Sequence, residues 1–333
     1  MKSKEILEFL LQHNQLSATD SRLLMEYITN GNFNPSQLAS VLTVFRMRPV
    51  TLTELENFRE VLLERSVQLD FSDIDPIDVC GTGGDGKNSF NISTLAAFVA
   101  AGAGVPVAKH GNHGVSGPTG SSTVLEQLGI HFTSDKDQLR EQLEKSGICF
   151  LHAPLFHPAL QRVSGVRRDL GMKTVFNMLG PLVNPARPRR QLAGVYNLEL
   201  ARTYAYFFQR HHHAFAVVHS LDGFDEVSLT SAFRLFTSEG ERLLRPEDLG
   251  VDSVKQEDLY SGKDPRDAAK LFMEILSGKS DPKKEQIVCA NAALAIRCRF
   301  EGLRIEDAFS LATESLRSGK ALQSFQQFKS LAS

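Results

Sequence analysis

Apolar residues recur three and four positions apart in the first 70 residues, which is the spacing of one face of an α-helix. Polar residues that can cap a helix stand before three of these stretches, at Ser17, Asn34 and Thr51. The pattern therefore predicts four short helices packed as a small bundle. Their apolar faces are Ile6, Leu7, Phe9 and Leu10 in the first; Leu23, Leu24 and Tyr27 in the second; Leu38, Val41, Leu42 and Phe45 in the third; and Leu55, Phe58, Val61 and Leu62 in the fourth.

From Asp75 onward, short apolar runs alternate with longer stretches of helical spacing. This alternation predicts an α/β domain with a mainly parallel central sheet flanked by helices. The candidate strands are residues 77–80, 105–108, 148–151, 192–196, 214–218 and 235–237, and the candidate helices are 95–103, 124–128, 135–145, 198–210, 264–276, 282–297 and 305–316. Because ligands of such sheets bind at the carboxyl ends of the strands, we expect the functional residues there.

The first candidate strand runs into four glycines within six residues, from Gly81 to Gly86. With few side chains in the way, the backbone N–H groups of this loop can approach an anion closely. A helix follows, with Asn91 or Ser93 as its N-cap, and a helix N-terminus also attracts anions. The arrangement favours a phosphate site. The alternative is a tight turn that only joins strand to helix, because the loop matches neither the Rossmann spacing nor a P-loop.

The second candidate strand, residues 105–108, is followed directly by Lys109. Small polar residues continue from there to Thr123, and Ser121 or Ser122 can cap the helix that follows. The lysine adds a positive charge to this second helix N-terminus. Two anion sites in succession indicate a ligand with two phosphate groups.

Several motifs of the chain occur in a fixed order. They are Gly81-Thr-Gly-Gly-Asp85, Asn91-Ile-Ser-Thr94, Lys109-His-Gly-Asn112 with Gly120-Ser121, His157-Pro-Ala159, Val166-Arg167, Phe176-Asn-Met-Leu-Gly-Pro-Leu-Val-Asn-Pro185 and Asp225-Glu226. This series closely resembles the anthranilate phosphoribosyltransferase family. The resemblance extends from about Glu5 to about Phe325, and an ordered series is far more specific than any one motif.

The resemblance implies an activity and a domain organisation. The activity is transfer of the phosphoribosyl group from 5-phosphoribosyl 1-diphosphate to the amine of anthranilate, with release of diphosphate, in tryptophan biosynthesis. Mg²⁺ is the implied cofactor, and the helical domain is the implied homodimer interface. The implied helical domain is residues 1–70 with a returning segment at about 164–190, and residues 71–163 and 191–333 form the α/β phosphoribosyl-diphosphate-binding domain.

The resemblance also implies the residues of the site. Those for 5-phosphoribosyl 1-diphosphate are Gly81, Gly84, Asp85, Ser89, Asn91, Ile92, Ser93, Thr94, Lys109, His110, Gly111, Asn112, His113, Gly114, Val115, Ser116, Gly117 and Ser121. Those for anthranilate are Gly81, His110, Asn112, His157, Arg167 and Gly180, and the metal ligands are Ser93, Asp225 and Glu226. No covalent nucleophile is implied.

The sequence departs from the family pattern in three places. His113 stands where the family commonly has arginine, and Ser122-Thr123 where it often has Ala-Asp. Thr230-Ser231-Ala232 stands where Thr-Gly-Pro is usual. These departures affect local contacts and leave the class of enzyme unchanged.

The residue types fit the chemistry of a diphosphate and an aromatic carboxylate. Asp225 and Glu226 are adjacent carboxylates that repel each other unless a cation lies between them, and Mg²⁺ binds one or two carboxylates together with phosphate oxygens. A solvated acidic loop is the alternative. Arg167, expected near the start of a short helix, can bind a planar carboxylate with both arms of its guanidinium group, whereas Arg168 is expected at the surface.

The histidines leave alternatives open. His110 and His157 line the anthranilate pocket or are buried histidines with satisfied hydrogen bonds. His211 to His213 form a run of three that suggests a metal cluster, but consecutive helix positions do not face one another. A solvated helix end explains this run better.

Composition narrows the class of partner. The formal net charge of −2 over 333 residues gives no support to a nucleic-acid or membrane partner. No apolar run approaches the ~18 residues of a membrane span. The four cysteines form no CxxC pair and are typical of reduced thiols, which predicts a cytoplasmic protein.

Two other functions compete with the transferase. A pyrimidine nucleoside phosphorylase shares the fold and a glycine loop but does not need the carboxylate pair Asp225-Glu226. A non-catalytic, nucleic-acid-binding relative would have a basic cleft and eroded motifs, and its affinity for DNA would fall with salt.

Overall fold

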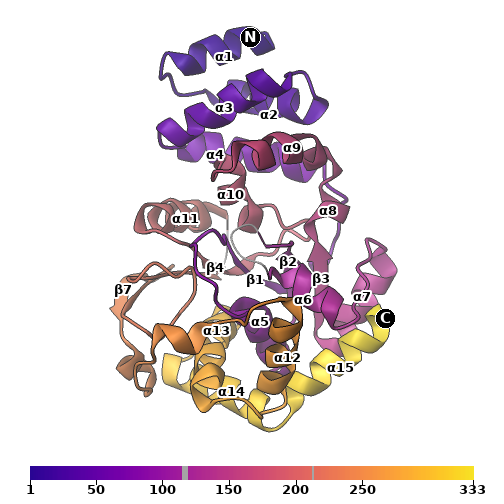
Figure 1. The fold of residues 1–333 in the computed structure, drawn as a ribbon, viewed down its shortest axis with the longest axis vertical. Coiled ribbons are helices and arrows are strands. Elements are labelled where there is room, and N and C mark those ends of the chain that lie inside the picture. Colours follow the sequence, from indigo (N-terminus) through magenta and orange to yellow (C-terminus); the bar gives the residue numbers. More distant parts are fainter. Residues whose placement is uncertain (115–118, 212–213) are drawn as a thin grey trace. The chain divides into compact units, whose positions relative to one another are not determined.

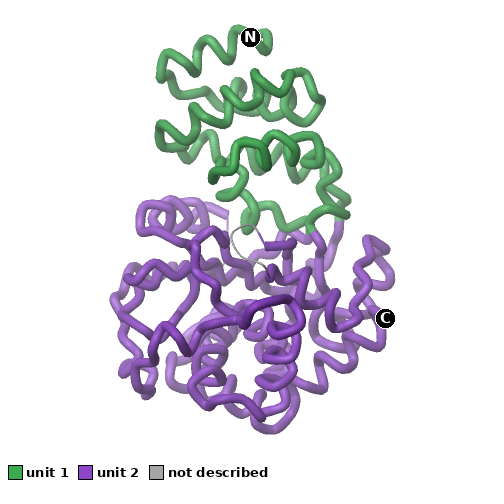
Figure 2. Tube along the Cα trace, viewed as in Figure 1, with its two compact units in different colours: residues 1–68, 153–185 green, residues 69–152, 186–333 purple. Residues whose placement is uncertain are grey.

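A computed structural model describes residues 1–114, 119–211 and 214–333. The chain forms two compact units, residues 1–68 with 153–185, and residues 69–152 with 186–333 (Figure 2). The returning segment therefore spans 153–185, where the sequence placed it at about 164–190. The segment begins after His152 because a strand of the central sheet ends at that residue, and the next strand begins at Arg190. Residues within these strands are hydrogen-bonded to the sheet and so belong to the other unit.

The helical unit contains the four helices expected from the sequence and three more from the returning segment (Figure 1). They are α1 (Ser3–Leu11), α2 (Ala18–Asn30), α3 (Pro35–Met47), α4 (Leu52–Glu64), α8 (Ala153–Phe156), α9 (Gln161–Leu170) and α10 (Val175–Leu179). Ser17, Asn34 and Thr51 each accept a backbone hydrogen bond at the start of α2, α3 and α4. The three capping residues predicted for the bundle are thus confirmed. At α5 (Ile92–Gly102), Asn91 is the N-cap residue, as one of the two predictions had it, but its side chain makes no capping hydrogen bond.

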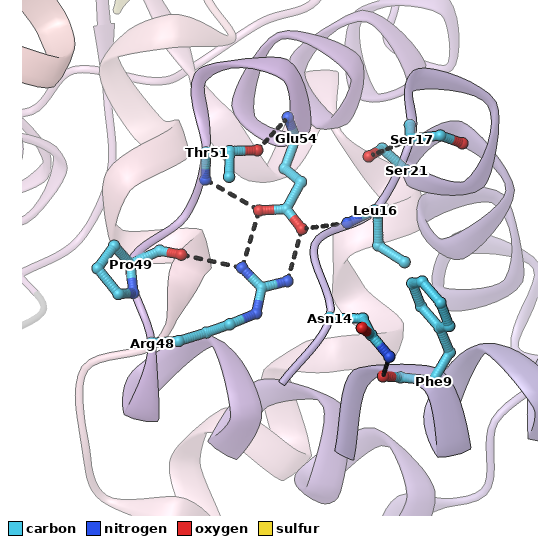
Figure 3. Close-up of polar contacts among 9 residues, drawn as sticks. All are labelled: Phe9, Asn14, Leu16, Ser17, Ser21, Arg48, Pro49, Thr51 and Glu54. Carbon is cyan, nitrogen blue, oxygen red and sulfur yellow. Dashed lines mark hydrogen bonds and ion pairs between the residues drawn. The ribbon is translucent and has the colours of Figure 1, made fainter. Parts of the chain in front are cut away.

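A buried ion pair fixes the connections of the bundle (Figure 3). The Glu54 side chain is fully buried, and its Oε1 lies 2.5 Å from Nη2 of Arg48. The same carboxylate accepts the N–H groups of Leu16, at 3.0 Å, and of Thr51, at 2.9 Å. One side chain therefore ties the α1–α2 connection to the α3–α4 connection. Burial alone would raise the pKa of Glu54, but the hydrogen bonds from Arg48, Leu16 and Thr51 outweigh it and hold the pKa below its ordinary value.

We expect Glu54→Gln to destabilise the protein by about 3 kcal/mol, because it leaves the Arg48 guanidinium buried without a counter-ion. Urea unfolding at neutral pH measures the effect. Because the pKa of Glu54 is depressed in the folded state, its contribution is present above the ordinary value of 4.5 and is lost as pH falls through the folded-state pKa. The gap between wild type and variant should therefore narrow in acid.

Glu64→Gln is the matched control, because Glu64 pairs with Arg22 at an exposed position. It should change the free energy of unfolding by less than about 1 kcal/mol. Equal losses in the two variants would contradict a special role for the buried pair.

The second unit is an α/β domain around one seven-stranded sheet, which confirms the predicted fold class. The strands are β1 (Ile77–Gly81), β2 (Val107–Gly111), β3 (Ile148–His152), β4 (Arg190–Gly194), β5 (Ala214–Ser220), β6 (Phe233–Thr237) and β7 (Gly240–Leu244), in the order β3-β2-β1-β4-β5-β6-β7. The first five are mutually parallel, and β6 and β7 pair in the antiparallel sense. The carboxyl ends of β1 to β5 therefore meet at one edge.

Helices cover this sheet and supply most of the core (Figure 1). They are α5 (Ile92–Gly102), α6 (Ser121–Gln127), α7 (Lys136–Ser146), α11 (Leu198–His211), α12 (Pro265–Leu276), α13 (Pro282–Arg299), α14 (Ile305–Arg317) and α15 (Lys320–Ala332). The first turns of α5 and α6 start close to the ends of β1 and β2. The helix α13 packs on α5, β4 and β5 and is buried along most of its length.

Three local expectations are corrected. The N-cap of α6 is Gly120, not Ser121 or Ser122, which both lie in its first turn. The strand β7 was not expected, because most of its residues are exposed and its short sequence has no buried apolar run, and it pairs only with β6 at the sheet edge. The helix α15 was also missed, although its buried Phe325 and Phe328 recur at helical spacing.

No helix in the described ranges has the length and apolar character that membrane crossing requires.

Candidate active site

Three of the parallel strands end on a glycine, and each glycine is crossed closely by another segment. A Cβ atom at Gly194 would lie 1.6 Å from the carbonyl oxygen of Asp225, and one at Gly81 would lie 2.7 Å from Asp225 Oδ2. At Gly111, a Cβ atom would lie 2.5 Å from Ser121 Oγ. Only glycine allows the loops after β2 and β5 to pass this close to the sheet.

The glycine loop after β1 has a backbone that other residues rarely adopt. The φ angles of Gly83, Gly84 and Gly86 are 61°, 79° and 74°, which is the left-handed region. The Thr82 N–H group donates to the Gly194 carbonyl at 2.9 Å and so fixes the start of the loop on β4. The Asp85 carboxylate accepts the N–H group of Lys87 within the loop.

The two carboxylates after β5 accept backbone N–H groups from the glycine loop and from α5. The N–H group of Gly83 donates to Asp225 Oδ2 at 2.7 Å. The N–H group of Ser93, in the first turn of α5, donates to Glu226 Oε1 at 2.9 Å. Both N–H groups therefore donate to adjacent carboxylates, at the loop and helix N-terminus where a strand–loop–helix anion site binds its ligand.

Burial and like charge raise the pKa values of the carboxylates near the glycine loop. Burial first, and then the charge of Asp85, raises the pKa of Asp225 to about 7. Burial and the neighbouring carboxylates likewise raise the pKa of Glu226 well above its ordinary range, and burial raises that of Asp85. Lys109 is buried and donates to the Val79 carbonyl and, at 3.4 Å, to Ser93 Oγ. Among the described residues, Lys109 lies near Glu226 and Lys87 near Asp85. Two lysines leave the three carboxylates with a net negative charge, which a divalent cation can neutralise.

The donor set fits Mg²⁺ in particular. Carboxylate and hydroxyl oxygens are available at Asp225, Glu226 and Ser93. No group of three or more His, Cys, Asp or Glu side chains is arranged as a complete metal site in the ranges that the structure describes. A metal held here must complete its coordination with water and ligand oxygens, which is the habit of Mg²⁺ with a diphosphate.

Other residues expected at the phosphoribosyl diphosphate lie on the same edge of the sheet. Asn91 Nδ2 donates to the Thr119 carbonyl at 3.1 Å and so links the start of α5 to the loop before α6. Ile92 and Thr94 are buried in the first turn of α5, and Ser89 pairs with Tyr260 through an antiparallel bridge.

The loop after β2 is held at both ends. The His110 N–H group donates to Asp78 Oδ1 at 3.1 Å. Ser121 Oγ donates to the Asn112 carbonyl at 3.2 Å, and a Cβ atom at Gly120 would lie 2.0 Å from the Gly114 nitrogen. Three residues expected at the ligand, Val115, Ser116 and Gly117, lie outside the described residues.

Comparison with known proteins decides the family. Residues 74–322 match the family model described as the glycosyl transferase family a/b domain. Residues 4–66 match the helical bundle domain of the same family. The chain is 49% identical to the anthranilate phosphoribosyltransferase of Flavobacterium johnsoniae, over 99% of each chain. The chain belongs to the anthranilate phosphoribosyltransferase family.

Other anthranilate phosphoribosyltransferases agree in sequence and in fold. The protein of that name from Bacteroides thetaiotaomicron is 48% identical over 98% of each chain. The enzyme of Thermus thermophilus superposes with a TM-score of 0.92 at 31% identity, covering 98% of this chain and 99% of that one. The Saccharomyces cerevisiae enzyme, solved with PRPP and Mg, gives a TM-score of 0.91 at 27% identity, covering 99% and 97%. The resemblance, the transferase activity and the enzyme class expected from the sequence are confirmed.

Two of the altered side chains, His113 and Ser122, have local partners in this chain, and so does Thr230, which keeps the family residue beside the altered Ser231. His113 Nε2 lies 3.1 Å from both carboxylate oxygens of Glu126 on α6. Ser122 Oγ lies 2.8 Å from Nδ1 of His152, at the end of β3. The Thr230 hydroxyl donates to the Asp222 carboxylate. Sequence reasoning did not find Glu126, His152 or Asp222, because these residues become neighbours only in the folded sheet.

In the helical unit, Arg167 lies in the last turn of α9, not near the start of a helix as expected. Its guanidinium lies 5.5 Å from the centroid of the Phe176 ring, and burial lowers its pKa. Arg168 is exposed, in agreement with the expectation. Gly180 begins a 3₁₀ turn, and a Cβ atom there would meet open space. A half-buried arginine beside an aromatic ring is suited to a planar, aromatic carboxylate.

The histidines divide into different environments. His157 is buried, and its Nε2 lies 2.8 Å from the Val183 carbonyl. Burial lowers the pKa of His157 to about 4, so it is neutral at pH 7. His211 stacks on Phe207 with ring centroids 4.5 Å apart, and His212 and His213 lie outside the described residues.

We expect Gly194→Ala to destabilise the protein strongly, by about 3 kcal/mol or more, because the new Cβ would overlap the Asp225 carbonyl, a backbone atom that cannot swing away. Thermal unfolding without ligand measures the loss. Gly165→Ala is the matched control, because nothing lies within 4 Å of a Cβ atom at this helical glycine. It should leave stability unchanged or raise it slightly. A melting temperature of Gly194→Ala equal to wild type would show that the approach of Asp225 to β4 is not required.

Proposed function

We propose that the loops after β1, β2 and β5 hold 5-phosphoribosyl 1-diphosphate and Mg²⁺, and that Arg167 binds the carboxylate of anthranilate. One observation carries the first part. The carboxylates of Asp225 and Glu226 accept the N–H groups of Gly83 and Ser93, which supports a single site for the proposed metal ligands and the proposed phosphate-binding loop. The yeast relative solved with PRPP and Mg supports the same pairing of ligand and metal.

In this proposal, the residues of the chain act by position and charge. Asp225, Glu226 and the hydroxyl of Ser93 hold Mg²⁺, which neutralises charge on the leaving diphosphate. The glycine loop, the N-terminus of α5 and Lys109 bind phosphate oxygens through N–H groups and positive charge. Fixing both substrates raises the effective concentration of the amine at C1 of the ribose.

No side chain needs to act as a nucleophile or strong base. The amine of anthranilate is unprotonated at neutral pH, so it attacks without a prior proton transfer. Burial raises the pKa of the Cys80 thiol, which is close to the glycine loop, to about 12. That thiol remains protonated at neutral pH and cannot attack the sugar.

A homodimer through the helical unit and a cytoplasmic location belong to the same proposal. Leu11 and Met47 are 56% and 70% exposed in the helical unit, and exposed apolar side chains of this size favour contact with a second copy. The free cysteines of the described residues agree with a reducing compartment.

We expect Asp225→Asn and Glu226→Gln to raise the Mg²⁺ concentration needed for half-maximal rate and to lower kcat. Each change keeps the shape of the side chain and removes one negative charge. Excess Mg²⁺ should restore part of the rate by mass action. A Mg²⁺ titration of the initial rate, with melting curves alongside, makes the measurement.

A purely structural role for the two carboxylates has a different signature, namely a lower melting temperature with an unchanged Mg²⁺ titration. That result would refute the metal assignment.

We expect Arg167→Ala to raise the KM for anthranilate and to leave the affinity for 5-phosphoribosyl 1-diphosphate near normal. Losing a buried contact between guanidinium and carboxylate costs about 2–5 kcal/mol. Arg168→Ala, at the exposed neighbouring position, is the control and should behave as wild type. A fluorescence assay of anthranilate consumption gives both constants. Equal loss of affinity for the two substrates would count against the assignment.

We expect Leu11→Lys with Met47→Lys to convert the dimer to a monomer, because two charges would be buried at the interface. Static light scattering at micromolar concentration measures the mass. Leu243→Lys is the control, because Leu243 is 43% exposed in the α/β unit and should leave the dimer intact. Wild-type protein that scatters only as a monomer would refute the dimer.

A further inference from the structure

One polar side chain lies inside the otherwise apolar part of α13. Asn291 is 3% exposed, and its neighbours in the helix from Ile287 to Ile296 are buried apolar residues. Burying an amide costs free energy unless each of its polar atoms finds a partner. A well-packed apolar side chain would avoid this cost, so the amide at this position needs a physical explanation.

All polar atoms of Asn291 are used, and two of its three hydrogen bonds go to one residue. Its Oδ1 accepts the N–H group of Val227 at 3.0 Å, and its Nδ2 donates to the carbonyl of Val227 at 2.9 Å. The second Nδ2 proton goes to the Ile287 carbonyl, one turn back in α13, at 2.9 Å. The side chain thereby pairs with Val227 as a neighbouring strand would pair with it.

Val227 directly follows Glu226, in the segment that joins β5 to β6 without sheet pairing of its own. Two residues on, Leu229 has a φ of 59°, a left-handed backbone that a leucine adopts only under constraint from its surroundings. Ser220 Oγ donates to the carbonyl of Glu226 at 2.6 Å, and this carbonyl belongs to the same peptide group as the Val227 N–H. The peptide group that directly follows the Glu226 side chain is therefore held by two side chains, Ser220 at its carbonyl and Asn291 at its N–H.

We propose that Asn291 is a positioning residue that fixes the backbone of Val227 and thereby aims the Glu226 carboxylate at the metal. This inference rests on the proposed role of Glu226 as a metal ligand. Asn291 acts through the loop, because its amide groups are fully used by Val227 and Ile287. Loss of a partner that orients a metal ligand typically lowers metal affinity about 10–100-fold.

The test compares Asn291→Asp and Asn291→Leu with Glu226→Gln and Ser315→Ala. The aspartate keeps the shape of the side chain but turns its donor to Val227 into an oxygen, and the leucine removes both contacts. Ser315 is a matched control because it is 1% exposed in the same unit and donates one hydrogen bond, to the Val99 carbonyl at 2.7 Å, away from the loop. Two quantities are measured: the Mg²⁺ concentration for half-maximal rate, and the rise in melting temperature when Mg²⁺ and inorganic diphosphate are added.

We expect both Asn291 variants to need about 10-fold more Mg²⁺ and to show a smaller rise in melting temperature. Ser315→Ala should start from a lower melting temperature but keep the wild-type Mg²⁺ titration. If Glu226→Gln shifts the titration and the Asn291 variants do not, the positioning role is wrong and the metal assignment stands. If Glu226→Gln leaves the titration unchanged, the metal assignment fails and the positioning role fails with it.

Hydrogen exchange of the wild-type enzyme decides the case if neither Asn291 variant folds. Positioning requires that the Val227 N–H group exchange slowly before metal is added. Slow exchange in metal-free protein supports the role of Asn291, and exchange at the rate of an open loop overturns it.

Discussion

The approach of Asp225 to the ends of β1 and β4 is the constraint on which the site depends. The loop after β5 crosses the sheet so closely that Gly81 and Gly194 cannot carry a Cβ atom without a clash. This crossing brings Asp225 to the N–H group of Gly83 and places Glu226 at the N–H group of Ser93. Residues more than a hundred positions apart thus form one site, because two strands end in the smallest side chain.

The same crossing creates an electrostatic problem that is only partly solved within the protein. Asp225 is buried, Asp85 and Glu226 are half-buried, and the pKa of each of the three carboxylates is raised. Backbone N–H groups, the N-terminus of α5 and the buried Lys109 offset part of the repulsion. In the proposed enzyme, Asp225, Glu226 and Ser93 would hold Mg²⁺, which would supply the positive charge that the protein's own groups do not. Like-charged carboxylates held close together would then gain free energy from binding the cation.

The sequence predicted the features that depend on neighbours along the chain. Helical spacing and the caps at Ser17, Asn34 and Thr51 predicted the bundle, and the glycines after Ile77–Cys80 predicted a loop that other residues cannot form. It missed contacts made by distant segments. Thr51 was predicted as a helix cap, but the ion pair of Glu54 with Arg48 and the contact of Glu54 with Leu16 arise only when helices pack. The placement of Arg167 failed because no capping signal precedes α9, which follows directly on a 3₁₀ turn.

The departures from the family pattern show how such a site tolerates change. His113 contacts Glu126 on the helix α6, and Ser122 contacts His152 at the end of β3. Thr230 joins a separate set of hydroxyl and carboxylate groups, with Ser228 Oγ at 2.7 Å and the Asp222 carboxylate, beside the loop of Asp225 and Glu226. His113 and Ser122 are thus altered side chains that still find partners, and Thr230, which keeps the family residue, holds the segment just before the altered Ser231 and Ala232. What the loops require is therefore an anchored backbone with satisfied polar groups, and more than one set of side chains provides it.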